Sequence, residues 1–123
     1  MTIDGLAARQ AVTQYEVVRR FRGYALLKAR PQTGRTHQIR VHLASIGLRI
    51  LADAVYSSRA TFTLADVTGR AEDAGAVLLA RQALHAWRLG LWHPITGRAV
   101  EFESPLPQDM ARTLAALEAH AAV

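Results

Sequence analysis

Side chains that can bind an anion crowd the start of a predicted helix in the first half of the sequence. The run from Arg35 to Arg40 reads Arg-Thr-His-Gln-Ile-Arg. Apolar Ile39, Leu43 and Ile46 recur with helical spacing, which predicts a helix with one apolar face. Donors at the start of a helix lie near the positive end of its dipole. The arrangement therefore suits a phosphate or a carboxylate.

A turn must place this helix after a strand. A strand-like run ends at Pro31, and Thr33-Gly34 follows as a turn. Thr33 or Thr36 can cap the first helical turn, and Gly47 can close the last. The predicted helix spans about residues 35–46.

The same run resembles a family signature. Residues 31–43 resemble the P-x-T-G-R-T-H-Q-I-R-V-H-L string of the RluA-type RNA pseudouridine synthases. Residues 47–56 resemble the family's G-x-P-I-x-G-D-x-x-Y string, with Arg49 in place of Pro and Ala52 in place of Gly. Pieces similar to L-H-A, H-P-x-T-G and L-P-x-D follow in family order, at residues 84–86, 93–97 and 106–109.

The nucleophile of that family is missing from this sequence. The family's catalytic Asp lies upstream, in an R-L-D-x-x-T-S-G string, and its active-site Tyr lies in a Y-x-A-x-V-x-G strand. Neither string occurs here, and none of the five aspartates follows Arg-Leu. We therefore expect residues 1–123 to form a single domain that is the C-terminal portion of a synthase catalytic domain, and not a complete enzyme.

The resemblance implies roles for two neighbouring residues. Arg40 matches the arginine that pairs with the nucleophilic Asp, and a guanidinium there keeps a carboxylate ionised and holds it bidentately. Ile39 matches the apolar residue that packs at the target base. The alternatives are a solvated face for Arg40 and ordinary core packing for Ile39. We expect the carboxylate partner of Arg40 to come from outside this chain. An acidic residue of the chain that closed Arg40 into a sealed interior would remove this role.

The other motif residues are expected to bind RNA or to order the backbone. Arg35 and His37 match the loop beside the site and are expected to contact RNA. Asp53 is expected to cap a turn or to hold an arginine of the Thr-Gly-Arg loop. The remaining residues are expected to be structural: Thr33, Gly34, Thr36, Gln38 and Tyr56.

The sequence predicts neither a metal site nor a cofactor. His37 and His42 would point in different directions on a helix, and no HExxH string is present. His85 and His93 are expected to be structural. The reaction implied by the resemblance needs no cofactor: Asp attacks the uridine, the glycosidic bond breaks, the uracil turns and a C–C bond forms at C5. The uridine must first be flipped out of its stack.

Charge and composition point to a polyanionic partner. The formal net charge of the 123 residues is +5, and all but one of the 15 Lys and Arg residues are arginines. Such a protein favours RNA or DNA, although an arginine-rich proteome gives the same composition. The absence of cysteine suits a reducing cytoplasm. No signal peptide is visible at Met1–Val12, and the longest apolar run, Ala76–Ala80, is too short to span a membrane.

Alternating residues predict a hairpin over 11–30, with Arg22-Gly23 as its turn. Its predicted strand places Thr13 and Phe21 on one face. Arg19, Arg20 and Arg22 gather at the tip, either as a prong that contacts phosphates or as a solvated turn.

The second half predicts another strand pair and a helix. A surface loop is expected over 57–75, a strand over 84–92, a return strand that carries Val100 and Phe102, and a helix from about Pro107. The predicted class is α+β, a mixed or antiparallel sheet of two strand pairs with two packed helices, as in part of a pseudouridine synthase fold. An uncovered apolar face is expected where a missing half, or a second copy, would pack.

The sequence leaves alternative functions open. The first is a piece of an RNA pseudouridine synthase, an isomerase acting on uridine in structured RNA such as rRNA or tRNA, which is inactive by itself. The second is a non-catalytic basic RNA-binding module. The third is a basic interaction protein with no RNA role.

Overall fold

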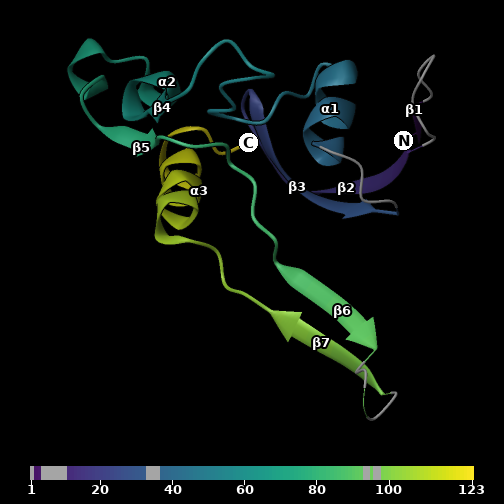
Figure 1. Cartoon of the computed structure of the whole chain (residues 1–123). Coiled ribbons are helices and arrows are strands. Elements are labelled where there is room, and N and C mark those ends of the chain that lie inside the picture. The colour runs from purple at the N-terminus through teal and green to yellow at the C-terminus, as the bar shows by residue number, and fades with distance from the viewer. Residues whose placement is uncertain (1, 4–10, 33–36, 93–94, 96–97) are drawn as a thin grey trace.

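The computed structural model describes residues 2–3, 11–32, 37–92, 95 and 98–123. Three short antiparallel sheets and three α-helices are found among these residues. One group contains β1, β2, β3 and α1, and a second contains α2, β4, β5 and α3 (Figure 1). The hairpin of β6 and β7 projects away from both groups (Figure 1).

The hairpin expected over 11–30 is confirmed. Strand β2 (Ala11–Phe21) pairs antiparallel with β3 (Tyr24–Pro31), and β1 (Thr2–Ile3) adds a third strand along β2. The turn residue Gly23 has a φ of 82°, a conformation that glycine adopts without steric cost.

The predicted facing of β2 is wrong beyond its middle. The register shifts between Val17 and Arg19, so Val18 is an extra residue without a partner on β3. Because one inserted residue reverses the alternation of side chains, Thr13 and Phe21 lie on opposite faces of the hairpin.

Helix α1 (Gln38–Ser45) packs on β2 and β3 and is shorter than predicted. The Gln38 amide donates to the Val12 carbonyl at 2.7 Å and to Thr13 Oγ1 at 2.9 Å. Gln38, His42 and Leu43 are the buried residues of this helix, whereas Ile46 is 44% exposed. The predicted apolar face of Ile39, Leu43 and Ile46 is thus only partly right.

The cap expected at the C-terminal end of α1 is present, whereas its N-terminal cap is a different residue from those expected. Its N-cap is His37 in the left-handed region, with a φ of 52°. The predicted caps Thr33 and Thr36 lie outside the described residues. Gly47, with a φ of 81°, follows the helix as expected.

Regular elements occupy the segment expected to be a surface loop. Residues 57–75 contain β4 (Phe62–Thr63), α2 (Leu64–Thr68) and a 3₁₀ helix (Ala71–Asp73), and β5 (Val77–Leu79) pairs with β4. The helix begins here because the Asp66 carboxylate accepts a hydrogen bond from the Thr63 backbone N–H at 2.7 Å.

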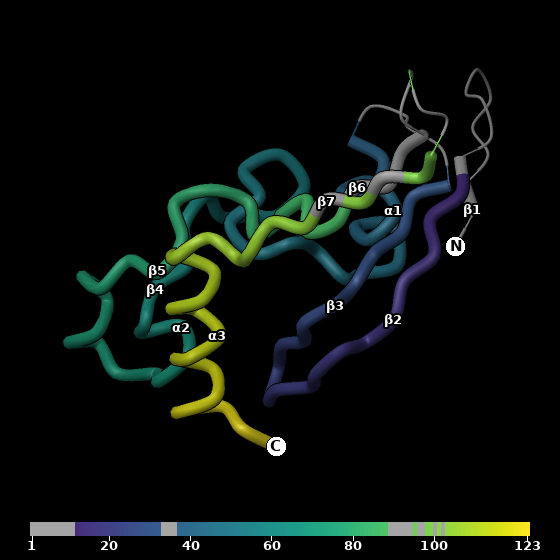
Figure 2. Tube along the Cα trace, turned by 90° about the horizontal axis from the view of Figure 1, so that it is seen from below, coloured from purple at the N-terminus to yellow at the C-terminus, as the bar shows by residue number. Residues whose placement is uncertain are grey.

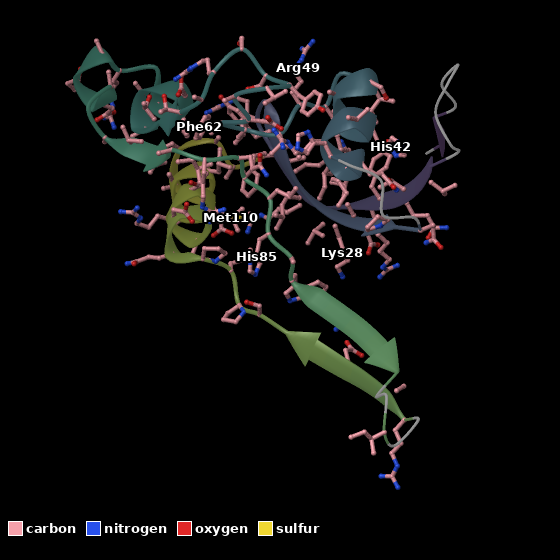
Figure 3. The ribbon with its side chains drawn as sticks, viewed as in Figure 1. Lys28, His42, Arg49, Phe62, His85 and Met110 are labelled. Carbon is pink, nitrogen blue, oxygen red and sulfur yellow. The ribbon has the colours of Figure 1, made fainter. Side chains whose placement is uncertain are left out.

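The second predicted strand pair is confirmed with shorter strands. Strand β6 (Arg88–Trp92) pairs antiparallel with β7 (Ala99–Glu103). The side chains of Val100 and Phe102 lie outside the described residues. Two cations lie within cation–π distance of the Trp87 ring, with Lys28 Nζ at 4.5 Å and Arg88 Cζ at 4.6 Å from its centroid. Lys28 points from β3 toward this hairpin (Figure 3).

Helix α3 (Gln108–His120) connects the groups and begins where predicted. It lies between α2 and the β2–β3 hairpin (Figure 2). Leu117 and Ala121 pack with Phe21 in one buried cluster, and Met110 packs against a second cluster of Ala52, Phe62 and Leu79.

The α+β class is confirmed at a coarse level. Every described strand pair is antiparallel, but the strands form separate small sheets and do not join into one. Within the described ranges, no helix combines the length and the apolarity needed to cross a bilayer.

We expect Leu79→Ala to lower the free energy of unfolding by about 3 kcal/mol, because the Leu79 side chain is 1% exposed and its loss leaves a cavity. Urea denaturation followed by circular dichroism measures this change. Val77→Ala is the matched control on the same strand, since Val77 is 49% exposed, and should cost less than about 0.5 kcal/mol. Equal costs at both positions would contradict the assigned core.

Candidate functional site

Arg40 and Asp53 form a bidentate ion pair. Arg40 Nε donates to Asp53 Oδ2 and Arg40 Nη2 donates to Oδ1, both at 2.7 Å. The Asp53 side chain is fully buried, and the Arg40 side chain is 11% exposed. Two parallel hydrogen bonds fix the orientation of the guanidinium as well as its position.

Asp53 is fixed by the backbone that follows it. Its Oδ1 accepts hydrogen bonds from the Val55 and Tyr56 N–H groups at 3.1 and 3.2 Å. The Ser57 hydroxyl donates to the Asp53 carbonyl at 2.7 Å. Ala52 directly before it has a φ of 57°, a conformation that favours glycine. This is the position at which the resembled string carries Gly.

The pair remains ionised over the ordinary pH range. The Arg40 hydrogen bond holds the pKa of Asp53 at about 2, and the Val55 and Tyr56 N–H groups lower it further against the opposing effect of burial. The hydrogen bond to Asp53 in turn raises the pKa of Arg40.

Tyr56 and His37 complete the surroundings of Arg40. The Arg40 Cζ atom lies 5.0 Å from the centroid of the Tyr56 ring, a cation–π distance. His37 Nδ1 lies 3.1 Å from the Tyr56 hydroxyl. We call Arg40, Asp53, Tyr56 and His37 the Arg40 cluster.

Arg40 also borders an open depression of about 340 Å³. Four alanines line much of it, at positions 52, 54, 60 and 80. The rest of its lining consists of Arg81, Gln82 and Leu84. Arg81 is paired with Asp109 at 2.9 Å. The Arg40 pair is therefore mostly buried, but it is not sealed from solvent.

The expectation that Arg40 lacks a carboxylate partner in this chain is wrong. Asp53 supplies one, because the turn after α1 brings its carboxylate back to the helix. Asp53 does hold an arginine, although that arginine lies in α1 and not in the Thr-Gly-Arg loop. Ile39 is half-buried. Four motif residues lie outside the described part of the chain: Thr33, Gly34, Arg35 and Thr36.

The predicted arginine prong is largely docked onto α3. Arg19 forms an ion pair with Glu118, and Arg22 Nη2 donates to the His120 carbonyl at 2.8 Å. The Arg20 side chain is exposed, and within the described part of the chain it forms no hydrogen bond or ion pair. Arg20 and Arg22 border a second open depression, of about 510 Å³. Arg20 is thus the most available of the three for a phosphate.

The histidines have separate environments. His85 Nε2 lies 3.0 Å from the Ser104 carbonyl, and His93 lies outside the described residues. His42 on α1 is buried, its Nδ1 has no hydrogen-bond partner in the described structure, and burial lowers its pKa. The described residues contain no group of three His, Cys, Asp or Glu side chains able to hold a metal ion.

Two arginines were given no role from the sequence, and one of them, Arg81, lines the depression beside Arg40. Arg81 was not singled out, because it lies in an irregular segment with no local pattern. The Arg49 side chain projects away from the body of the molecule (Figure 3). It occupies the position where the resembled string has Pro, and that departure was the available signal.

Comparisons with known proteins show which sequences this chain resembles. A family model described as RNA pseudouridylate synthase matches residues 2–45, which include Arg40. An RNA pseudouridine synthase of Bacillus subtilis is 43% identical over 114 residues, which are 93% of this chain and 32% of that protein. Ribosomal large subunit pseudouridine synthase D of Haemophilus ducreyi is 44% identical over 89% of this chain and 33% of its own length. The protein of that name from Nitrosomonas europaea is 48% identical over 89% of this chain and 30% of its own length. The chain thus spans about a third of these relatives.

We expect Asp53→Asn to lower the free energy of unfolding by about 3 kcal/mol at pH 7, because it leaves Arg40 mostly buried without a counter-charge. The pKa of Asp53 is depressed from 3.8 to about 2, which contributes about 2 kcal/mol of stability above pH 4. This contribution should be lost as the pH falls from about 4 to about 2. The difference in free energy of unfolding between wild type and Asp53→Asn should therefore become smaller over that range.

Urea denaturation at a series of pH values tests this. Glu103→Gln is the control, because it removes an ion pair whose side chains are about half exposed, and it should change stability by less than about 1 kcal/mol. If the difference in free energy of unfolding between wild type and Asp53→Asn stays constant down to pH 2, the ionised pair does not stabilise the fold.

Proposed function

We propose, on the premise that this chain belongs to the RluA-type RNA pseudouridine synthases, that it forms the wall of a synthase active site that receives the nucleophilic carboxylate. The observation that carries the proposal is the fixed Arg40 guanidinium, which lies in the matched region and borders an open depression. Ile39, next to it on α1, would pack at the target base.

The nucleophile must then come from another segment. The chain spans about a third of its relatives and contains no R-L-D-x-x-T-S-G string. We propose that this segment is an upstream part of the same polypeptide or a partner chain. The missing string supports an external source for the nucleophile. Among the described aspartates, Asp53 alone pairs with Arg40, so no second aspartate of the described chain takes the place of the nucleophile.

The proposed reaction is an isomerisation with no net gain or loss of atoms. The Asp carboxylate attacks the uridine, the glycosidic C–N bond breaks, and the uracil turns so that C5 bonds to the ribose carbon that N1 has left. The carboxylate is then released, C5 loses its hydrogen and N1 takes up a proton, so the atoms balance. Arg40 would keep the carboxylate ionised and aligned. Several relatives are named for the ribosomal large subunit, so we propose structured rRNA in the cytoplasm as the substrate.

A non-catalytic RNA-binding module is the second candidate. The observation that favours it is the Asp53 carboxylate, which already satisfies two donors of Arg40 within this chain. In that case the positive charge and the exposed Arg20 would retain RNA without turnover.

We expect the chain alone to release no tritium from RNA labelled at C5 of uridine. Mixing or co-expression with a polypeptide that carries the upstream part of an RluA-type synthase, including its R-L-D-x-x-T-S-G string, should give tritium release. Arg40→Ala should lower this activity about 100-fold or more, because the nucleophile loses its alignment.

Arg112→Ala, an exposed position on α3, is the control and should retain activity. Turnover by the chain alone would overturn the proposed need for an external nucleophile. Unchanged activity of the Arg40→Ala mixture would remove Arg40 from the mechanism.

We expect RNA binding to weaken as salt rises, because phosphate contacts release counterions. Filter binding of structured RNA between about 50 and 200 mM salt measures this dependence. Arg20→Ala should make the slope of log affinity against log salt shallower by about one. Glu118→Gln should release Arg19 for a phosphate and make the slope steeper.

Glu72→Gln is the matched control, because it changes the net charge equally at an exposed residue of the 3₁₀ helix. Equal effects of the two Glu→Gln changes would show that overall charge, and not the arginine tip, determines RNA affinity. An affinity independent of salt would count against both RNA functions.

A further inference from the structure

We propose that Asp53 is a positioning residue, which holds one edge of the Arg40 guanidinium so that its other edge faces the nucleophilic carboxylate. The inference rests on the proposed synthase function. It also resolves the conflict raised by the Arg40–Asp53 pair, because a guanidinium can bind a carboxylate at each of two edges.

The hydrogen bonds show which edge is in use. Asp53 takes Nε and one hydrogen of Nη2. A guanidinium carries five N–H donors, so both hydrogens of Nη1 and one of Nη2 remain. In the described part of the chain no hydrogen bond reaches Nη1. The Nη1–Nη2 edge therefore has the paired donors that a second carboxylate requires.

The support beneath Arg40 is rigid. Asp53 is fully buried and is held by the Val55 and Tyr56 N–H groups and by the Ser57 hydroxyl. The Tyr56 ring lies against the guanidinium. The arginine is thus ordered before any nucleophile arrives, which removes part of the entropic cost of assembling the site.

The depression beside Arg40 offers a route for a second carboxylate. Alanines line much of it, at positions 52, 54, 60 and 80. These short side chains leave space for a segment of another polypeptide to approach Arg40. The only other cation of this lining is Arg81, whose charge is already matched by Asp109.

Sharing one guanidinium between two carboxylates has a chemical consequence. The Arg40 charge lowers the pKa of the nucleophile, and the Asp53 charge partly opposes that effect. Removal of the Asp53 charge should therefore lower the pKa of the nucleophile.

The test uses the chain assembled with the upstream polypeptide, with tritium release measured against pH. Asp53→Asn should lower kcat about 100-fold through misalignment of Arg40. It should also move the acidic limb of the pH profile about one pH unit lower. Asp53→Glu keeps the charge and should restore the position of the limb with a smaller loss of kcat. Glu103→Gln, on the projecting hairpin, should change neither.

A second measurement needs no activity, so it separates failure of this inference from failure of the synthase assignment. In the chain alone, the Arg40 Nε–H proton should exchange slowly with solvent in nuclear magnetic resonance spectra. Exchange should become at least about tenfold faster in Asp53→Asn. The loss of a charge-assisted hydrogen bond should raise the population of the exposed, exchange-competent state by more than about tenfold.

Equal exchange in wild type and Asp53→Asn would overturn the positioning role. So would an acidic limb that stays in place in Asp53→Asn while kcat falls. If Asp53→Asn does not fold, Asp53→Glu decides the matter through the same two measurements. In Asp53→Glu, slow Arg40 Nε–H exchange and an acidic limb at the wild-type pH support the inference. Fast exchange in Asp53→Glu together with a wild-type kcat overturns it.

Discussion

The mostly buried pair of Arg40 and Asp53 is the interaction on which this structure depends most. Removing two charges from water is costly, and the cost is offset here by two short hydrogen bonds and by two backbone N–H groups on the same carboxylate. The pair joins α1 to the turn that follows it and fixes the backbone of residues 52–57. The carboxylate that stabilises this region therefore also sets the direction of the guanidinium.

Local sequence patterns predicted the elements that are specified locally. The β2–β3 hairpin follows from alternation and from Gly23, and α1 and α3 follow from helical spacing and their ends. Helix α2 was missed, although Thr63 and Asp66 have the spacing of a capping pair. Its surroundings are rich in small polar residues, and they obscured that signal.

The features that local patterns did not predict depend on contacts between distant residues. Gln38 and His42 face inward because Gln38 finds a carbonyl and a hydroxyl on β2, and no helical periodicity contains that information. Asp53 was recognised as a residue that could hold an arginine, but its partner depends on how the turn after α1 folds back. The resemblance to synthases marked Arg40 as important without showing that two of its five donors already bond Asp53.

The unpaired Val18 of β2 has a consequence for the whole architecture. Thr13, before it, contacts Gln38 of α1, while Phe21, after it, packs against Leu117 of α3 and against Ala121, which follows that helix. A regular ribbon would present both residues to the same side and leave one helix without its contact. This single inserted residue reverses the alternation of side chains along β2. One face of the hairpin can therefore pack against α1 and the opposite face against α3. A deletion at position 18 would put the two helices in competition for one surface, so the length of this strand is as constrained as any side chain in the core.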